Sequence, residues 1–217
     1  MSDSPLRIAI DGPSGAGKST LARALARALG LRYLDTGAMY RAVAWKAMQA
    51  QAVDADEVVA LLEKLDMQVI ADPENFRVRI EGFDVTDELR TPAVGRRASE
   101  VAQIPAVRAW LLQRQRAEAE GGAVLEGRDI GSAVLPDADA KLFITAPEAE
   151  RLQRRALQLV GASAAEVAED VRARDRRDQR RPTSPLRIPP DATVIDTGGE
   201  DEKTSLERVL SVVRAAR

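Results

Sequence analysis

Short apolar segments alternate with longer segments of helical periodicity along most of the chain. Residues 6–11 form a compact apolar run, and Leu21, Leu25 and Leu29 then recur at the spacing of one helix face. This alternation is typical of an α/β fold with three layers, in which a mainly parallel sheet is flanked by helices. The pattern predicts strands at 6–11, 31–34, 123–126, 140–145 and 192–196, and helices at 18–29, 37–50, 55–65, 106–119, 147–160, 163–180 and 203–216.

Residues 66–95 depart from this alternation. Apolar residues and arginines alternate over 76–80, which predicts a half-buried antiparallel strand. Residues 67–69 predict its hairpin partner, and residues 82–85 a third strand. Such an insert covers a ligand or is a plain surface insertion, and the pattern leaves both interpretations open. We therefore expect a single domain, 1–217, with a core of 1–65 and 96–217 and a small antiparallel insert at about 66–95.

Composition narrows the possible chemistry to charged and hydroxyl side chains. The 217 residues include no cysteine and no histidine, which excludes disulfides, thiolate catalysis and the commonest general base. A net charge of −2 and 3% aromatic residues argue against a nucleic-acid partner. We find no signal peptide and no long apolar run, so we expect a cytoplasmic protein without a membrane partner. Phosphoryl transfer suits this composition because its catalysis is mostly positioning and charge stabilisation.

The nine residues after the first predicted strand form the most specific motif. They fit G-x-x-x-x-G-K-[ST], the phosphate-binding P-loop, between a strand and a helix as the motif requires. Its glycines let backbone N–H groups point at an anion, Lys18 reaches the β- and γ-phosphates, and the Ser19 hydroxyl ligates Mg²⁺. A glycine-rich turn without a ligand is the alternative. The predicted ATP-binding residues are Gly12, Pro13, Ser14, Gly15, Ala16, Gly17, Lys18, Ser19 and Thr20.

Polar residues also follow the second predicted strand, at the kind of strand end where ligands bind in open α/β sheets. Thr36 and Arg41 are placed to hold a second phosphate group at the start of a helix. A solvated surface arginine is the alternative for Arg41. Asp35 is one candidate to orient the water shell of Mg²⁺.

Glu126, Arg128 and Asp129 form a third polar cluster, again at a strand end. Glu126 occupies the position of a Walker-B carboxylate, so it is the other candidate for Mg²⁺, and the sequence does not decide between it and Asp35. Arg128 and Asp129 are adjacent and point differently, so they serve separate polar groups. A structural Arg–Asp turn is the alternative.

The densest run of charge lies in the predicted helix 163–180 and just beyond it. Arg174, Asp178 and Arg181 fall at i, i+4 and i+7 and share one helix face. Two guanidinium groups and one carboxylate suit the phosphates and ribose hydroxyls of a nucleotide. A solvated helix with weak intrahelical ion pairs is the alternative.

The predicted helix 147–160 carries another basic cluster, Arg151, Arg154 and Arg155, before a break at residues 161–163. We interpret about 150–166 as a helical lid that brings arginines onto the transferring phosphoryl group and excludes water. Simple surface charge is the alternative. Residues 197–202 form a polar loop to which the sequence assigns no chemical role.

Four motifs together resemble the bacterial cytidylate kinases, a family of P-loop nucleoside monophosphate kinases. They occur in the family's order and spacing, and the resemblance covers nearly the whole chain. It implies a P-loop NTPase-type fold whose insert binds the monophosphate, and transfer of the γ-phosphoryl group of ATP to CMP or dCMP with Mg²⁺ as cofactor. The motifs are IDGPSGAGKST at 10–20, LDTGAMYR at 34–41, EGRDIG at 126–131 and RDRRDQRR at 174–181.

The resemblance also implies a role for individual residues. Ser99 and Arg108 depend on it alone, because the sequence around them is unremarkable. The residues implied to bind CMP form three groups. The acceptor as a whole would be held by Thr36, Arg41 and Arg128. The cytosine edge would be contacted by Ser99, Arg108 and Asp129, and the sugar and phosphate by Arg174, Asp178 and Arg181. Implied to act on the moving phosphoryl group are Lys18, Arg128, Arg154, Arg155 and Arg181.

Other functions stay open on the sequence alone. A kinase for another nucleotide or a hydroxylated metabolite would share the P-loop, although the insert and the arginine-rich helix favour a nucleotide acceptor. A GTPase-like switch reads guanine through N-K-x-D, and the only asparagine of this chain is Asn75. Intact Lys18 and Ser19 argue against a non-catalytic binding protein. We expect a monomer whose partners are small-molecule nucleotides.

Overall fold

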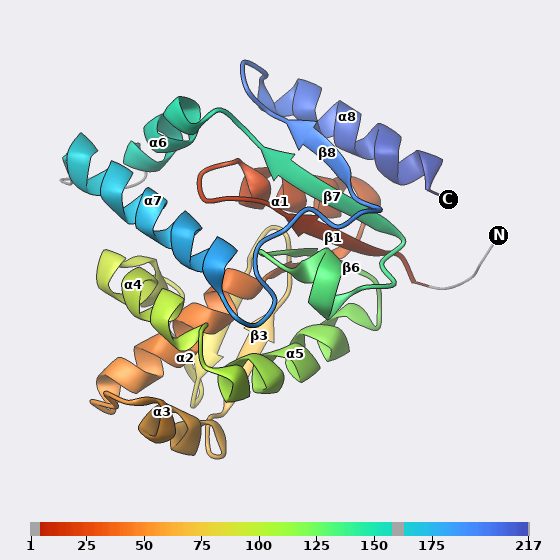
Figure 1. Ribbon diagram of the computed structural model, residues 1–217. Coiled ribbons are helices and arrows are strands. Elements are labelled where there is room, and N and C mark those ends of the chain that lie inside the picture. Colours follow the sequence, from red (N-terminus) through yellow and green to blue (C-terminus); the bar gives the residue numbers. More distant parts are fainter. Residues whose placement is uncertain (1–4, 158–162, 217) are drawn as a thin grey trace.

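The main sheet contains five strands, all parallel, in the order β2-β6-β1-β7-β8 (Figure 1). The computed structural model describes residues 5–157 and 163–216. The strands are β1 (Arg7–Asp11), β2 (Arg32–Asp35), β6 (Ala123–Glu126), β7 (Ala140–Thr145) and β8 (Thr193–Asp196). The predicted parallel sheet is therefore confirmed, and the carboxyl ends of its strands meet at one edge.

Helices cover both faces of this sheet, which confirms the three-layer arrangement. On one face α1 (Lys18–Leu29) packs against α8 (Glu202–Ala215). On the other, α2 (Thr36–Gln49) and α5 (Pro105–Ala119) pack against each other and against β6. Helix α3 (Ala55–Leu62) packs on α2 and α5 and ends before the predicted residue 65. Figure 1 shows α8 above the sheet and α5 below it.

A second, three-stranded sheet lies beside the first. Its antiparallel strands β3 (Met67–Ile70), β4 (Arg77–Ile80) and β5 (Phe83–Asp84) confirm the predicted hairpin and third strand. Tyr33 N donates to Ala71 O at 3.0 Å, and the Phe76 ring meets the Tyr33 ring edge-on with centroids 5.6 Å apart. The small sheet is thus fastened to the outer strand β2 of the main sheet.

Helix α4 (Pro92–Val101) was not predicted from the sequence. It follows a 3-10 turn at Glu88–Arg90 and begins at Thr91, whose hydroxyl accepts a hydrogen bond from Val94 N at 3.4 Å. A capping threonine followed by proline at the first position is a common helix start, so this signal was available. The helix packs against α2 and α7, and Ser99 is among its buried residues.

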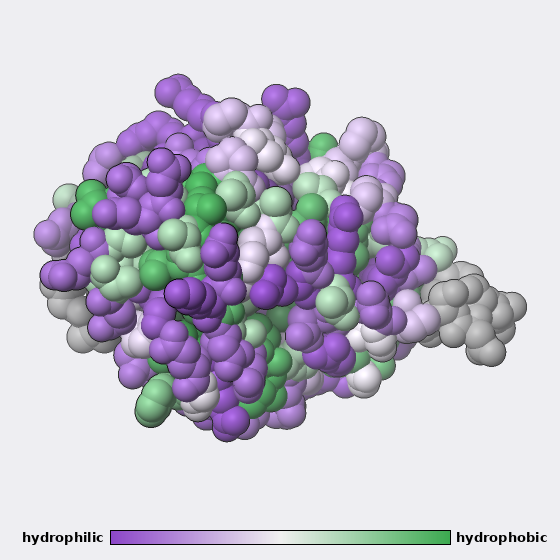
Figure 2. Space-filling model, turned by 90° about the horizontal axis from the view of Figure 1, so that it is seen from below, coloured by the Kyte–Doolittle hydropathy of each residue, from purple (hydrophilic) through white to green (hydrophobic). Residues whose placement is uncertain are grey.

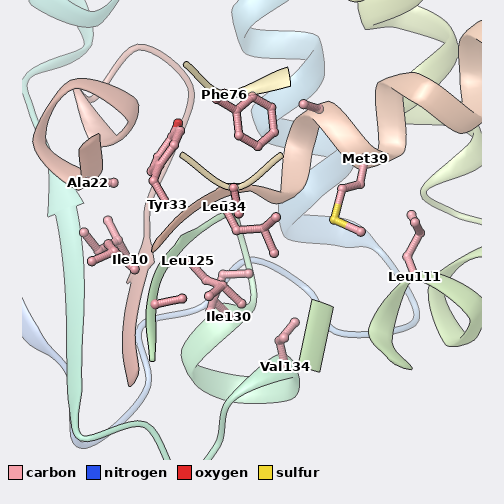
Figure 3. Close-up of a cluster of buried hydrophobic side chains, with 14 of the residues drawn as sticks. Ile10, Ala22, Tyr33, Leu34, Met39, Phe76, Leu111, Leu125, Ile130 and Val134 are labelled. Atoms are coloured by element: carbon pink, nitrogen blue, oxygen red, sulfur yellow. The ribbon is translucent and has the colours of Figure 1, made fainter. Parts of the chain in front are cut away.

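The hydrophobic core fixes the ends of the central strands. Ile10, Leu34 and Leu125 come from three neighbouring strands and are fully buried, and Figure 3 shows them beside Met39 and Ile130. Burying such a side chain contributes about 1.5–3 kcal/mol. Because every strand residue of β6 is buried, the polar groups at its carboxyl end start from a rigid position.

Helices α6 (Glu148–Ala156) and α7 (Ala164–Arg180) lie beyond the carboxyl ends of the strands (Figure 1). The predicted lid of about 150–166 covers most of α6 and only the first turn of α7, and its residues 158–162 lie outside the described part of the chain. Helix α7 begins with a capping box between Ser163 and Glu166.

The surface between and around these elements is mainly polar. On the face shown in Figure 2, hydrophilic side chains predominate and hydrophobic atoms are visible between them. Among the described residues, no helix combines the length and the apolar character that crossing a bilayer would need.

Candidate active site

The P-loop connects β1 to α1 at the carboxyl edge of the sheet. Gly15 has φ +76, and a Cβ there would lie 2.5 Å from the carbonyl oxygen of Arg151. At Gly12, with φ +146, a Cβ would collide with the carbonyl oxygen of Ile144. Both positions therefore need glycine for conformation and for space. The loop ends at the N-terminus of α1, where free N–H groups and the helix dipole favour an anion.

Lys18 begins α1 and turns back over the loop. Its side chain is buried, and Nζ donates to Pro13 O at 2.6 Å. Burial and then the nearby guanidinium of Arg128 lower the pKa of Lys18 to about 7, although Glu126 opposes both. An anion placed against this ammonium would restore its charge, so the position suits a phosphate group.

Glu126 and Asp35 differ in how far their oxygens are already engaged. Asp35 Oδ1 accepts from Ala38 N at 2.8 Å, and its Oδ2 accepts from Arg41 Nη2 at 2.7 Å. These partners lower the pKa of Asp35 although burial opposes them. Asp35 therefore caps α2 and fixes Arg41, and this leaves it less available to a metal ion.

Glu126 has the opposite character. Burial and then Asp35 raise its pKa, while hydrogen bonds from Tyr33 Oη, at 2.5 Å, and from the Ser19 hydroxyl lower it. The carboxylate thus lies close to the serine of the P-loop. Over residues 5–157 and 163–216 no group of three or more acidic side chains could hold a metal alone. One carboxylate with one hydroxyl is the small oxygen set on which Mg²⁺ sites with substrate phosphates are built.

Asp11 is a functional candidate that the sequence analysis missed. It ends β1, is buried, and accepts hydrogen bonds from Ile130 N and Gly131 N, each at 2.8 Å. Burial raises its pKa to about 6 in spite of these bonds. Asp11 thereby holds the turn that follows β6, which positions Arg128 and Asp129. An acidic residue at the end of an apolar strand was the available signal.

Two of the three residues expected at the cytosine edge, Arg108 and Asp129, come together, whereas the contacts of Ser99 stay within its own helix region. Arg108 on α5 pairs with Asp129, and both side chains are buried. Arg181, just after α7, lies 3.6 Å from the same carboxylate. Ser99 on α4 is buried, and its hydroxyl is bonded to Gly95 O at 3.5 Å.

The aromatic ring beside this group was also missed. The ring of Tyr40 lies 5.7 Å from the guanidinium carbon of Arg108. Burial raises the pKa of Tyr40 to about 12. The charge of Asp129 raises this pKa as well, whereas the charge of Arg181 lowers it. Its signal was a place in the same motif as Thr36 and Arg41. Thr36 itself is buried and donates to Glu126 O at 2.6 Å.

The charged face of α7 points into the site. Asp178 Oδ2 accepts from Arg128 Nε at 2.9 Å, and both side chains are largely buried. Arg128 and the other cations lower the pKa of Asp178 against the effect of burial. These pairs run between elements, so the alternative of a solvated helix with intrahelical ion pairs is wrong for this face.

Cationic groups converge where the acceptor face meets the P-loop. Burial lowers the pKa of Arg174, Arg128, Arg41 and Arg155 act in the same direction and Asp178 opposes them, and the result is a pKa of about 10. Arg128 and Arg174 likewise lower the pKa of Lys18. Like charges disfavour one another at close range, so a protein gathers them where an anion will bind. The residues of this group are Lys18, Arg41, Arg128, Arg155 and Arg174.

The predicted lid arginines Arg154 and Arg155 occupy two different places. Burial lowers the pKa of Arg155, Asp170 opposes this, and Arg41 and Arg128 lower the pKa, so Arg155 lies near the cationic group. Arg154 instead donates to Thr197 Oγ1 at 2.9 Å and to Thr197 O at 2.8 Å.

Thr197 belongs to a loop to which the sequence assigned no chemical role. Its hydroxyl also contacts Ala16 O of the P-loop at 3.2 Å. A cavity of about 190 Å³ opens here, and the loop contributes to its lining. The lining residues are Gly17, Thr20, Leu21, Arg154, Thr197, Glu200, Asp201, Glu202 and Ser205. The sequence assigned no role to residues 197–202, but the structure shows that this loop shapes a concavity at the end of the P-loop.

A parallel sheet that ends in a P-loop, faced by convergent cations, is the architecture of the P-loop kinases, which are ATP-dependent phosphotransferases. A structure of an uncharacterized protein from Eubacterium ventriosum shares this fold with a TM-score of 0.57 at 14% identity, covering 97% of this chain and 99% of that one.

Sequence comparison narrows the class. The family model "Cytidylate kinase" matches residues 8–215. A cytidylate kinase of Desulfitobacterium hafniense is 47% identical over 213 residues, covering 95% of this chain and 92% of the relative. One from Caldanaerobacter subterraneus is 44% identical over 216 residues, covering 96% and 95%. The chain belongs to the cytidylate kinase family.

Proposed function

We propose that this chain transfers the γ-phosphoryl group of MgATP to CMP or dCMP, giving ADP and CDP or dCDP. The convergence of Lys18 and four arginines between the P-loop and the face of α7 carries this proposal. Two of these arginines pair with carboxylates, Arg41 with Asp35 and Arg128 with Asp178, yet five cations at close range still favour anionic ligands, and two facing phosphate groups supply such charge. Family membership supports the cytidine acceptor.

The donor nucleotide is proposed to lie along the P-loop, residues 12–20. Its phosphates would meet the loop amides and Lys18, and its base the cavity between Arg154 and the 197–202 loop. For Mg²⁺, Ser19 and Glu126 fit better than Ser19 and Asp35, because Asp35 already uses both oxygens on Ala38 and Arg41. When bound, Mg²⁺ supplies charge neutralisation at the transferring phosphates.

The acceptor is proposed to occupy the space between α2, α4, α5 and α7. Arg41, Arg128 and Arg174 would hold its phosphate, with the Thr36 hydroxyl close by. Asp178 and Arg181 would contact the sugar and phosphate. We also propose that the insert of about 66–95 serves the acceptor side of the site, within one kinase domain. It supports that side through β2 and α2, which pack against it.

The Arg108–Asp129 pair gives a physical reason for cytosine selectivity. Cytosine offers an amino group as donor at position 4, which a carboxylate accepts, whereas uracil has a carbonyl there. Asp129 would take this amino group, and Arg108 would donate to the ring acceptors beside it. Ser99, on the neighbouring helix, would complete the polar edge. A uracil carbonyl would instead face Asp129 with two acceptors opposed.

The mechanism needs no general base from the protein. An oxygen of the acceptor phosphate, already anionic, attacks the γ-phosphorus in line, and the bond to the β–γ bridging oxygen breaks as ADP leaves. Lys18, Arg128, Arg155 and Arg181 would stabilise the charge on the moving group. Arg154 is proposed to act there from the donor side, held by Thr197. This chemistry agrees with a chain that has no histidine.

Release of ADP from MgATP tests the proposal, with CMP, dCMP, UMP, AMP, GMP, dTMP and shikimate as acceptors. We expect turnover with CMP and dCMP well above the rest. Preference for another acceptor would overturn the proposed substrate, and no turnover would overturn the proposed activity.

We further propose that the protein acts as a monomer in the cytoplasm, in pyrimidine nucleotide metabolism, without nucleic-acid or membrane partners. Sedimentation with and without nucleotides tests the monomer.

A further inference from the structure

Helix α7 contacts the P-loop through Asp175, a residue that has no role in the proposed function. Asp175 Oδ1 accepts a hydrogen bond from Ser14 N at 3.0 Å, and both residues are buried. Asp175 Oδ2 accepts from Arg151 Nη1 at 2.6 Å, and the same nitrogen donates to Ser14 O at 2.8 Å. One ion pair therefore grips Ser14 by both its N–H and its carbonyl oxygen.

This clamp, defined as Asp175 with Arg151, joins both α6 and α7 to the loop. Arg151 lies on α6, and its own carbonyl oxygen is so close to Gly15 that only glycine fits there. The side chains of Asp175 and Arg151 are each 12% exposed. Charge-assisted hydrogen bonds shielded from water are stronger and more directional than those on an open surface.

The same helix reaches the acceptor side one turn later. Asp178, three residues after Asp175, holds Arg128 through the 2.9 Å bond to Nε. Residues three apart on a helix are neighbours about 5–6 Å apart, fixed by the helix backbone. Helix α7 thus links the donor loop, through Asp175, to the acceptor-holding turn, through Asp178.

We propose that Asp175 is a positioning residue: by clamping Ser14 together with Arg151, it sets the distance between donor and acceptor phosphates. The inference rests on the proposed function, because it assumes a donor at the P-loop and an acceptor at Arg128. In-line transfer needs reacting atoms about 3–3.5 Å apart, and a misplacement of about 1 Å costs on the order of 10²-fold in rate. Loss of the clamp acts on this distance more than on either binding site.

The test is Asp175→Asn, assayed with MgATP and CMP. Asparagine keeps an acceptor oxygen for Ser14 N but loses the charge that pairs with Arg151. We expect kcat to fall about 10-fold or more, and KM for ATP and for CMP to change by less than about 3-fold. The matched control is Glu169→Gln, which breaks an exposed pair with Arg176 on the same helix and leaves kcat unchanged.

Three results would overturn the inference: unchanged kcat in folded Asp175→Asn, a loss confined to KM, or a lower Tm with full kcat per folded molecule. Combining Asp175→Asn with Arg151→Met must cost no more than the larger single loss, and multiplied losses contradict a clamp. If Asp175→Asn does not fold, Arg151→Gln must reproduce the loss of kcat. Wild-type turnover with the acceptor panel tests the proposed function separately, and any acceptor it identifies serves for this test.

Discussion

The P-loop is built from nine consecutive residues, whereas the proposed acceptor site takes its charges from α2, α5, α7 and the turn after β6. In the loop, backbone N–H groups and glycine conformations make the anion site, with Lys18 as its one buried cation. In the acceptor site, arginines are held by carboxylates, such as Arg41 by Asp35 and Arg128 by Asp178. A backbone site tolerates no added side-chain atoms, while a site of ion pairs depends on its partners.

This difference predicts that a change at the loop affects turnover with every acceptor. Lys18→Ala removes the buried ammonium that would meet the transferring phosphates, so kcat should fall by about 10²–10³-fold or more. The fold should stay intact, as judged by circular dichroism and Tm, since Lys18 contributes one hydrogen bond to the loop. Turnover near that of the wild type would show that Lys18 does not act on the transferring phosphates.

The backbone character of the loop is tested by Gly15→Ala. A methyl group there meets the carbonyl oxygen of Arg151 at 2.5 Å, on a residue with φ +76. We expect a loss of about 1–3 kcal/mol in unfolding free energy, with reduced ATP affinity. The matched control is Gly121→Ala, where no described atom lies within 4 Å of the added carbon and φ is not positive. Chemical denaturation should find Gly121→Ala within about 0.5 kcal/mol of the wild type.

The ion pairs of the acceptor site predict selectivity effects without loss of the donor site. Asp129→Asn removes the charge that faces Arg108, so the ratio of kcat/KM for CMP over UMP should fall about 10-fold or more. Asp178→Asn, which frees Arg128 instead, should raise KM for CMP and UMP alike and preserve the ratio. Equal ratios in wild type and Asp129→Asn would show that the base is read elsewhere.

The smallest expected effect is a proton taken up on ATP binding. Burial and Arg128 lower the pKa of Lys18 to about 7 in the free protein, so its ammonium is mostly neutral at pH 8 and mostly charged at pH 6. Phosphates beside it raise this pKa, so proton uptake should grow from pH 6 toward one proton at pH 8. Titration calorimetry in buffers of different ionisation enthalpy measures it. Uptake that persists in Lys18→Ala would assign the proton to another group.

The sequence predicted the features that are local in the chain. The main strands, most helices and the P-loop follow from periodicity and one contiguous motif, and the structure confirms them. Helix α4 was not predicted because Gly95, Arg96 and Arg97 interrupt the helical spacing of its apolar residues. The ring of Tyr40 beside Arg108 brings together residues on different helices, and no spacing along the chain encodes that contact.

The site contacts that were not predicted from the sequence share one physical cause. The bonds of Asp11 to Ile130 and Gly131 and of Asp175 to Ser14 join segments more than a hundred residues apart. Their worth comes from burial, which only the packed chain creates. The choice between Asp35 and Glu126 likewise depended on which carboxylate the fold had already engaged.

The central claim, that donor and acceptor occupy separate sites built by different means, is tested most directly by titrating CMP into the Lys18→Ala variant without ATP. We expect CMP affinity within about 3-fold of the wild type, because ion pairs away from the loop would hold the acceptor. Loss of CMP binding together with turnover would contradict it and place the acceptor on the P-loop itself.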